Sequence, residues 1–417
     1  MAQLSDDCFA FGSAPMPLDQ AAAELAQRVT PVREHEAVPL READGRVLAK
    51  TLLAPIDLPP FANSAVDGYA VRHADLVADG PTALPVAGRV AAGQVAAALA
   101  PGSAIRIFTG APMPAGADTV FMQEDTTQQG ATVLLPAGLR RHANARMAGE
   151  DIAAGAVALP AGRRLRPQDL ALAAALGVDR LAVRRRLAVA VFSTGDELAP
   201  PGAPLGPARI HDSNRPMLLS LLTRAGALPT DLGILPDDPA ALATALAEAA
   251  RTHDVLLTSG GVSTGEEDHV KAALARAGRL DHWRVSIKPG RPVAMGTVGG
   301  AAFVGLPGNP VAVFVTFAHI VRPLLAALAG EAWAPPRRMP VRLGFAHRKK
   351  AGRREFLRAT LLPDAADGGW VAMKWPTDGA GVITSLTGTD GLLELPEAAT
   401  RLEAGDLAGF LDYAALG

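Results

Sequence analysis

Cysteine is almost absent from this chain of 417 residues, and neither sign of charge dominates it. The single cysteine, Cys8, excludes a disulfide within the chain and a zinc site built from cysteines. The 40 basic and 42 acidic residues leave a net charge of -2, which provides no general attraction to nucleic acid or to an anionic membrane. We therefore expect neither nucleic acid nor a membrane as a partner.

Long hydrophobic runs and targeting signals are also missing. The apolar residues make up 49% of the chain but fall into short amphipathic segments, below the roughly 20 residues of a membrane-spanning helix. The N-terminus contains Asp6 and Asp7 and lacks the basic start and apolar stretch of a secretory signal. A cytoplasmic protein is therefore expected. It should contain several domains, because 417 residues exceed what one hydrophobic core normally serves.

Changes in pattern along the chain predict a multidomain fold of the α/β plus β class. Short apolar runs between prolines and glycines in 55–149 indicate strands and tight turns. From Leu187 onward, apolar runs alternate with helical segments, which is typical of a parallel α/β sheet. We expect an N-terminal helical or mixed domain (1–54 and 150–182), an inserted β-rich domain (55–149), a central parallel α/β domain (183–332) and a small C-terminal β-domain (338–417).

Three loops follow predicted strands of the α/β domain, at the sheet edge where ligands gather and helix N-termini point outward. They are "STGDEL", "SGGVSTGEED" and "GLPGNP". Ser259, Gly260, Gly261 and Ser263 of the second loop form a nest for an oxyanion. This loop lacks the lysine of the GxxxxGK[ST] motif, so a nucleoside triphosphatase is not indicated. A bare glycine hinge is the alternative.

The turn "GLPGNP" leaves two interpretations open. Gly308 permits close backbone approach and Pro310 suits the first position of a helix, so Pro307, Gly308 and Asn309 fit a ligand-binding loop. A tight strand-to-helix turn explains the same residues.

The glycine loop runs directly into Glu266, Glu267 and Asp268. Two like charges 4 Å apart cost about 4 kcal/mol at an effective dielectric near 20, so an anionic ligand here requires a cation. Magnesium fits, because it binds one or two carboxylates together with phosphate oxygens. Asp196, Glu197 and Asp268 are the candidate ligands, whereas Glu266 and Glu267 suit the first turn of a helix.

Basic and acidic residues elsewhere add to this set. Arg284, Lys288 and Arg291 surround a Pro-Gly turn and suit an oxyanion such as phosphate, sulfate or molybdate. Asp67 and Gly68 lie in "NSAVDGYAV", for which a plain Asp-Gly hairpin is the alternative to a functional role. The long loop 107–125 would lose much entropy on ordering, so we expect a partner surface or a ligand to hold it.

Together these stretches resemble the molybdopterin molybdenumtransferases, a family similar to the E domain of gephyrin. The matching segments occur in the order of the family and cover most of the chain: "NSAVDGYAV", "FTGAPMPAGADTV", "AGEDI", "STGDEL", "DSNRPML", "TSGGVSTGEEDHVK", "IKPGRPVAMG" and "GLPGNPVAVFVTF". Arg284 and Arg291 stand where lysine is common in the family, and His211 and His269 where tyrosine is common, so details of the pocket are expected to differ.

The resemblance implies insertion of molybdate into adenylylated molybdopterin with release of AMP, aided by Mg²⁺. It implies a homodimer in which the β-rich domain of one chain faces the α/β domain of the other, and a molybdopterin adenylyltransferase as upstream partner. Asp67, acting in trans, and Glu197 would be catalytic. The residues expected to contact substrate are Thr109, Asp151, Ser259, Gly260, Gly261, Ser263, Lys288, Arg291, Pro307, Gly308, Asn309, Arg353 and Ser385.

Two rival functions stay open at this stage. The adenylyltransferase of the preceding step shares the α/β domain, although the additional domains and the "DGYA" segment disfavour it. A scaffold that keeps the fold and serves as an assembly platform is the other.

Overall fold

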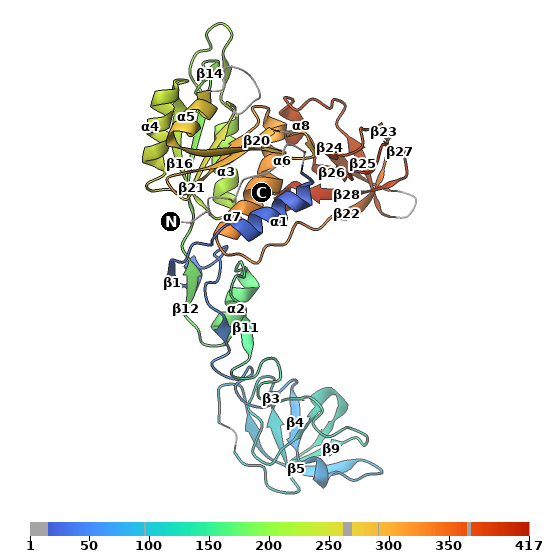
Figure 1. Ribbon diagram of the computed structural model, residues 1–417. Coiled ribbons are helices and arrows are strands. Elements are labelled where there is room, and N and C mark those ends of the chain that lie inside the picture. Colours follow the sequence, from blue (N-terminus) through green and yellow to red (C-terminus); the bar gives the residue numbers. More distant parts are fainter. Residues whose placement is uncertain (1–15, 96, 262–268, 291, 365–367, 417) are drawn as a thin grey trace.

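The computed structural model describes residues 16–95, 97–261, 269–290, 292–364 and 368–416. Figure 1 shows an elongated chain, with the α/β and C-terminal domains at one end and the β-rich domain at the other. The multidomain mixture of α/β and β architecture expected from the sequence is confirmed. The domain limits given above stay a prediction.

The α/β domain is built on a six-stranded sheet in the order β16-β13-β17-β21-β20-β18. The first four strands are parallel, as expected. The other two strands extend the sheet in antiparallel fashion. The basic segment 283–292, expected to surround a turn, therefore begins in the last residues of β18 and ends at the first residue of β20. The strands are β13 (Ala188–Thr194), β16 (Leu228–Leu235), β17 (Val255–Ser259), β18 (Gly278–Arg284), β20 (Pro292–Val298) and β21 (Ala301–Leu306).

Helices cover both faces of this sheet. Successive side chains of a strand point to opposite faces, so Val189 and Val191 of β13 lie in one core and Ala190 and Phe192 in the other. Burial on both faces explains the continuous apolar runs that predicted these strands. The first core also contains α1 (Leu18–Arg28), α3 (Asn214–Arg224), α6 (Pro310–Thr316) and α7 (Arg322–Leu328), and the second contains α4 (Pro239–Ala249) and α5 (His269–Ala277).

The helix predicted over residues 310–328, after the last parallel strand, is confirmed. Helices α6 and α7 join through a π-helical turn, η4 (Phe317–Val321), into one continuous helix from Pro310 to Leu328. Within the described residues it is the one helix long and apolar enough to cross a membrane, and 78% of its apolar window is buried inside the protein. Because most of its apolar surface is buried, this helix is part of the protein core.

Strands that precede the inserted domain in the chain pair with strands that follow it. β1 (His35–Pro39) pairs with β12 (Arg180–Arg184), and β2 (Leu52–Leu53) pairs with β11 (Val157–Leu159). Helix α2 (Pro167–Ala175) packs beside them and begins at a proline, which suits the first position of a helix. The short 3₁₀ helix η1 (Leu40–Glu42) follows β1.

The β-rich domain contains a sheet in the order β7-β4-β6-β5-β9-β8. Its strands are β4 (Gly68–Val71), β5 (Thr82–Val90), β6 (Ala104–Ile107), β7 (Thr119–Met122), β8 (Thr127–Gln129) and β9 (Thr132–Leu135), with β3 (Asn63–Ser64), β10 (Ala145–Arg146), η2 (His73–Asp75) and η3 (Gln123–Asp125) beside them. The Asp-Gly hairpin does not form, because β3 pairs with β10 whereas β4 pairs with β6 and β7. A Cβ on Gly68 would lie 1.7 Å from the carbonyl oxygen of Phe121, so only glycine fits there.

Hydrogen bonds within the chain order loop 107–125, for which a partner surface or a ligand was expected. The N–H groups of Gly110 and Met113 donate to the carbonyl oxygens of Ser64 and Ala62, at 2.8 and 2.9 Å. The chain's own backbone therefore orders the loop, and the segment ends in strand β7.

The C-terminal domain closes into a ring of five strands. The sheet order β24-β25-β22-β28-β26 returns to its start through pairing of β26 with β24, and β19 (Ile287–Lys288) adds to β24 from the α/β domain. The remaining elements are β14 (Leu198–Ala199), β15 (Ile210–His211), β22 (Met339–Leu343), β23 (His347–Arg348), β24 (Arg354–Pro363), β25 (Trp370–Lys374), α8 (Thr384–Thr387), β26 (Gly391–Leu395), β27 (Arg401–Leu402), β28 (Leu407–Asp412) and α9 (Tyr413–Leu416).

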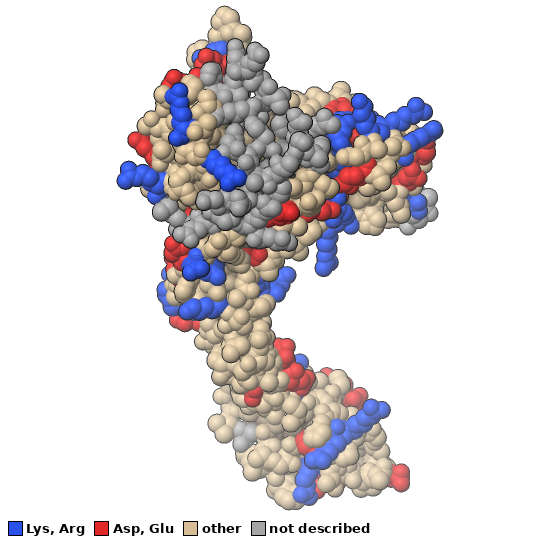
Figure 2. All heavy atoms as spheres, viewed as in Figure 1, with Lys and Arg blue, Asp and Glu red and all other residues tan. Residues whose placement is uncertain are grey.

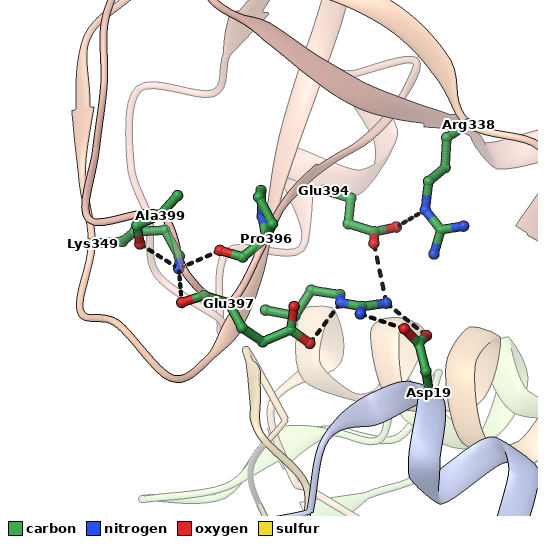
Figure 3. Close-up of polar contacts among 8 residues, drawn as sticks. Asp19, Arg338, Lys349, Glu394, Pro396, Glu397 and Ala399 are labelled. Carbon is green, nitrogen blue, oxygen red and sulfur yellow. Dashed lines mark hydrogen bonds and ion pairs between the residues drawn. The ribbon is translucent and has the colours of Figure 1, made fainter.

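A buried arginine fastens this ring to helix α1. The Arg354 guanidinium donates to both carboxylate oxygens of Asp19, at 2.8 and 2.7 Å, and to Glu397 Oε1 at 2.9 Å. It also lies 3.2 Å from Glu394 Oε1, and Glu394 in turn accepts from Arg338 Nε at 2.7 Å. Figure 3 shows Asp19 on α1 facing Glu394 and Glu397 across this network. Hydrogen bonding to Arg354 outweighs partial burial and lowers the pKa of Asp19.

Replacement of Arg354 by methionine is expected to destabilise the protein by on the order of 3 kcal/mol, because it removes the buried guanidinium that three carboxylates share and leaves the buried Glu394 with Arg338 alone. Urea denaturation of both proteins measures the effect. Since the pKa of Asp19 is depressed, its share of the stabilisation is present above pH 3.8 and is lost as the pH falls below that value.

The matched control is Arg401→Met, which removes an exposed arginine paired with Glu403. An exposed pair contributes less than about 1 kcal/mol, so this variant should unfold close to the wild type. Equal unfolding midpoints for the two variants would contradict the proposed importance of Arg354.

Candidate active site

An open pocket of about 280 Å³ lies at the carboxyl ends of β13 and β17, beside the turn after β21. Glu197, Ser259, Gly260, Gly308 and Asn309 line it, so the structure brings together predicted residues from all three loops. Pro307, also predicted, is buried behind the turn and does not line the pocket. Ser263 lies outside the described residues.

The glycines let these loops approach one another. A Cβ on Gly261 would lie 2.6 Å from a methyl group of Val270, and one on Gly195 would lie 2.4 Å from a carboxylate oxygen of Glu197. Both glycines have positive φ. Gly260 donates its N–H to the carbonyl oxygen of Leu306 at 3.0 Å, so this predicted anion donor is already in use.

Acidic side chains gather at this edge of the sheet. Glu197 lines the pocket, and Asp196 is exposed next to it. The sequence analysis missed Asp237, which follows β16 and accepts a hydrogen bond from Thr194 Oγ1 at 3.2 Å. Its position directly after β16, the parallel strand whose loop the sequence analysis did not consider, was the available signal. Asp268 lies outside the described residues, and among those described no three potential ligands cluster to hold a metal ion by themselves.

The segment "DSNRPML" supports the pocket. Asn214 Nδ2 donates to the carbonyl oxygen of Gly308 at 2.7 Å, which holds the "GLPGNP" turn. Asn214 Oδ1 is buried without a hydrogen-bond partner among the described residues. His211, the residue found where tyrosine is common in the family, also lines the pocket.

A loop of the C-terminal domain completes the pocket, which the sequence analysis did not foresee. Gly381 and Ile383 line it, and the carbonyl oxygen of Ala380 accepts from the N–H of Val311 at 3.0 Å. We call residues 377–385 the cap loop. It places a segment far along the chain over the first turn of α6.

Arg358 holds the cap loop from inside the ring. Its guanidinium is buried and donates to the carbonyl oxygens of Thr377 and Gly379, at 2.9 and 3.1 Å, and to Ser385 Oγ at 2.9 Å. Ser385, predicted to bind substrate, is fully buried and donates to Val382 at 2.6 Å. It therefore supports the cap loop and does not line the pocket.

The predicted basic residues lie at the junction with the C-terminal domain, and none that is described lines the pocket. Lys288 on β19 pairs with the buried carboxylate of Glu355 on β24, a partner the sequence analysis missed. Arg353 directly precedes β24. Burial lowers the pKa of Lys349. The positive charges of Arg353 and Lys288 lower this pKa further, whereas nearby carboxylates raise it. Arg291 and the side chains of Arg284 and His269 are outside the described part.

Asp67 and Thr109 form a second site on the β-rich domain. Asp67 Oδ1 accepts from both the N–H and the hydroxyl of Thr109, at 2.8 and 2.7 Å. These bonds, and the charge of Arg106, hold the pKa of Asp67 below its usual value. The domain lies far from the pocket along the chain (Figure 1). Asp151 is exposed, with its N–H bonded to Leu58, and lies in neither site.

Three family models match the chain. Residues 16–177 match the MoeA N-terminal region (domain I and II), 190–327 a probable molybdopterin binding domain, and 340–413 the MoeA C-terminal region (domain IV). The chain is similar to a molybdopterin molybdenumtransferase of Haemophilus influenzae, with 40% identity over 82% of this chain and 85% of that protein.

Further relatives cover nearly the whole chain. Molybdopterin molybdenumtransferase 2 of Mycobacterium tuberculosis is 36% identical over 93% of this chain and 96% of that protein. The crystal structure of a molybdopterin biosynthesis MoeA protein from Pyrococcus horikoshii superposes with a TM-score of 0.80 at 30% identity, covering 96% of this chain and 100% of that one. Sequence motifs, fold and relatives agree, and the chain belongs to the MoeA family of molybdopterin molybdenumtransferases.

Proposed function

We propose that this protein is an enzyme of molybdenum cofactor biosynthesis that inserts molybdate into adenylylated molybdopterin and releases AMP. The observation that carries the proposal is the pocket itself, where the Glu197 loop, two glycine turns and the cap loop of another domain meet. The names of the relatives give the reaction class.

The pocket suits a ligand with a polar, phosphate-bearing part. Its volume of about 280 Å³ is near the lower end of those of ligand sites. Glycines at positions 260 and 308 keep side chains away from the ligand, and Ser259 and Asn309 offer polar groups. Binding across several loops would position the phosphoanhydride for cleavage, which is most of what such chemistry needs from a protein.

The acids at the sheet edge suit a magnesium ion that also binds substrate oxygens better than a metal ion bound by protein ligands alone. Magnesium keeps several waters and takes one or two carboxylates plus substrate phosphate oxygens. Glu197 and Asp196 are exposed at the pocket edge, and Asp237 lies on the same edge. These carboxylates would hold the ion, which when bound supplies charge neutralisation between the carboxylates and the diphosphate.

Positive charge at the junction with the C-terminal domain is arranged to favour an oxyanion. Lys288, Lys349 and Arg353 gather around Glu355 at the junction with the C-terminal domain. Glu355 is buried and fixes the ammonium group of Lys288, whose side chain stays 39% exposed. We propose that molybdate binds near this junction, with Lys288 as one of its partners.

The second site on the β-rich domain supports a homodimer with shared active sites. Asp67 and Thr109 are bonded to each other yet lie at the far end of the chain from the pocket (Figure 1). If both groups act on one substrate, the β-rich domain of a second copy supplies Asp67 to the pocket. An adenylyltransferase would deliver the substrate to this dimer, and the reaction would take place in the cytoplasm.

Glu197→Gln is expected to slow AMP release at least about tenfold, because it removes charge where the metal and diphosphate meet. The assay incubates protein with adenylylated molybdopterin, molybdate and magnesium and follows AMP and cofactor formation. Chelation of magnesium should slow the wild type similarly. Glu248→Gln, which removes an exposed acid of α4 away from the pocket, is the control.

Other outcomes of this assay identify the rival functions. A wild type that consumes ATP to adenylylate free molybdopterin would be the enzyme of the preceding step. A folded Glu197→Gln variant with unchanged cofactor formation would favour a scaffold.

Mixed dimers test the shared site. Asp67→Asn and Glu197→Gln homodimers are expected to be impaired, whereas a heterodimer of the two variants keeps one site with both native residues. Such a heterodimer should release AMP at about half the wild-type rate. A heterodimer as inactive as its parents would place each complete site within one chain.

Arg358→Lys is expected to raise the KM for adenylylated molybdopterin by about tenfold, because lysine keeps the charge but its single ammonium nitrogen cannot span the three partners that hold the cap loop. Ser385→Ala removes one of these bonds and should change KM by less than about threefold. Steady-state kinetics of AMP release measures both. An unaltered KM in Arg358→Lys would separate the cap loop from substrate binding.

A further inference from the structure

We propose that Arg106, with Arg89 beside it, binds a phosphate oxyanion of the substrate next to Asp67. This inference rests on the proposed function and extends its site on the β-rich domain. It assigns to Arg106 a binding role that neither the sequence motifs nor the pocket of the α/β domain indicate.

Strand register places these side chains on one face of the sheet. Tyr69 of β4 lies opposite Arg106 of β6, and Arg89 of β5 lies beside Arg106 on the other side. Phe108 directly follows β6 and Asp67 directly precedes β4; Arg106 lies over the Phe108 ring, and its charge acts on Asp67. The buried part of the face belongs to a core with Tyr69 and Phe121, while Arg106 and Phe108 are only partly buried.

Aromatic rings and an amide hold the two guanidinium groups. Arg106 Cζ lies 4.8 Å from the ring centroid of Tyr69 and 5.3 Å from that of Phe108, and Arg89 Cζ lies 4.6 Å from that of Phe108. Arg106 also donates to Gln123 Oε1. These contacts orient the guanidinium groups, so less side-chain freedom is lost when an anion binds.

Neither arginine has a carboxylate partner within the described part of the chain. By contrast, Arg72 and Arg141 of the same domain pair with Asp75 and Asp118. Among the described residues Gln123 alone accepts a hydrogen bond from Arg106, whose guanidinium has five N–H donors. Figure 2 shows basic side chains crossing this domain on the face in view. The group thus retains both positive charge and free donors.

The charge of this cluster decides which ligand fits. Asp67 alone would repel a phosphate, and its hydrogen bonds from Thr109 favour the ionised form. Two guanidinium groups, those of Arg106 and Arg89, accompany the one carboxylate of Asp67, and Glu124 adds a carboxylate on the far side of Gln123. A guanidinium binds two oxygens of a phosphate with parallel hydrogen bonds, which an ammonium group does not. The arrangement therefore suits a phosphate oxyanion held close to a carboxylate.

The test compares full-length Arg106→Gln with Arg140→Gln, which removes an exposed arginine of the same domain. Arg106→Gln is expected to raise the KM for adenylylated molybdopterin at least about tenfold, while Arg140→Gln stays near the wild type. Arg106→Lys should recover only part of the loss, because it restores charge without the bidentate geometry. Circular dichroism and gel filtration confirm that each variant is folded.

Calorimetric titration with inorganic pyrophosphate separates this inference from the proposed function. We expect Arg106→Gln to weaken pyrophosphate binding and Arg140→Gln to leave it unchanged. If the wild type turns over adenylylated molybdopterin, an unchanged KM in Arg106→Gln overturns the inference and leaves the function intact. If the wild type shows no turnover, the proposed function fails, and the titration alone decides: equal pyrophosphate affinity in Arg106→Gln and wild type overturns the inference.

Discussion

The ion-pair network of Arg354 determines how the C-terminal ring sits against the rest of the protein. Arg354 lies on β24 and binds Asp19 of α1 together with two acids of the ring. The same strand carries Glu355, which pairs with Lys288, and Arg358, which holds the cap loop. One strand thus sets the junction with α1, the position of a basic group and the wall of the pocket. A buried charge must be paired, so these contacts specify one docking geometry.

Charge balance is the second constraint on the site. Carboxylates follow several parallel strands at the edge where phosphate-binding loops usually lie, and glycines bring those loops together. Basic groups in both parts of the proposed shared site are kept in place by partners: Lys288 at the junction with the C-terminal domain by Glu355, and Arg106 on the β-rich domain by Tyr69 and Gln123. Fixed charges of both signs would let the proposed anionic substrate and cation bind together, with little reorganisation during the reaction.

The two polar sites of one chain are the basis of the proposed homodimer. The pocket belongs to the α/β domain and Asp67 to the β-rich domain, and these domains lie at opposite ends of the elongated molecule (Figure 1). The Thr109 bonds order the Asp67 site within the β-rich domain, whereas the pocket is built where the α/β domain meets the cap loop that Arg358 holds. The β-rich domain can therefore move relative to the other domains without dismantling either site, and in the proposed homodimer the relative position of two copies would be part of the chemistry.

The sequence by itself determined the class of each segment, the parallel strands and the loops at their carboxyl ends, because apolar periodicity and glycine or proline turns are local properties. It also placed Glu197, Ser259, Gly308 and Asn309 near one another, since parallel strand ends share an edge. Only the tertiary structure decided that the cap loop reaches this edge, that Ser385 is buried beneath it and that Arg354 joins α1 to the ring. Those contacts join residues far apart in the chain, and docking between domains depends on complementary charge and shape that no local pattern records.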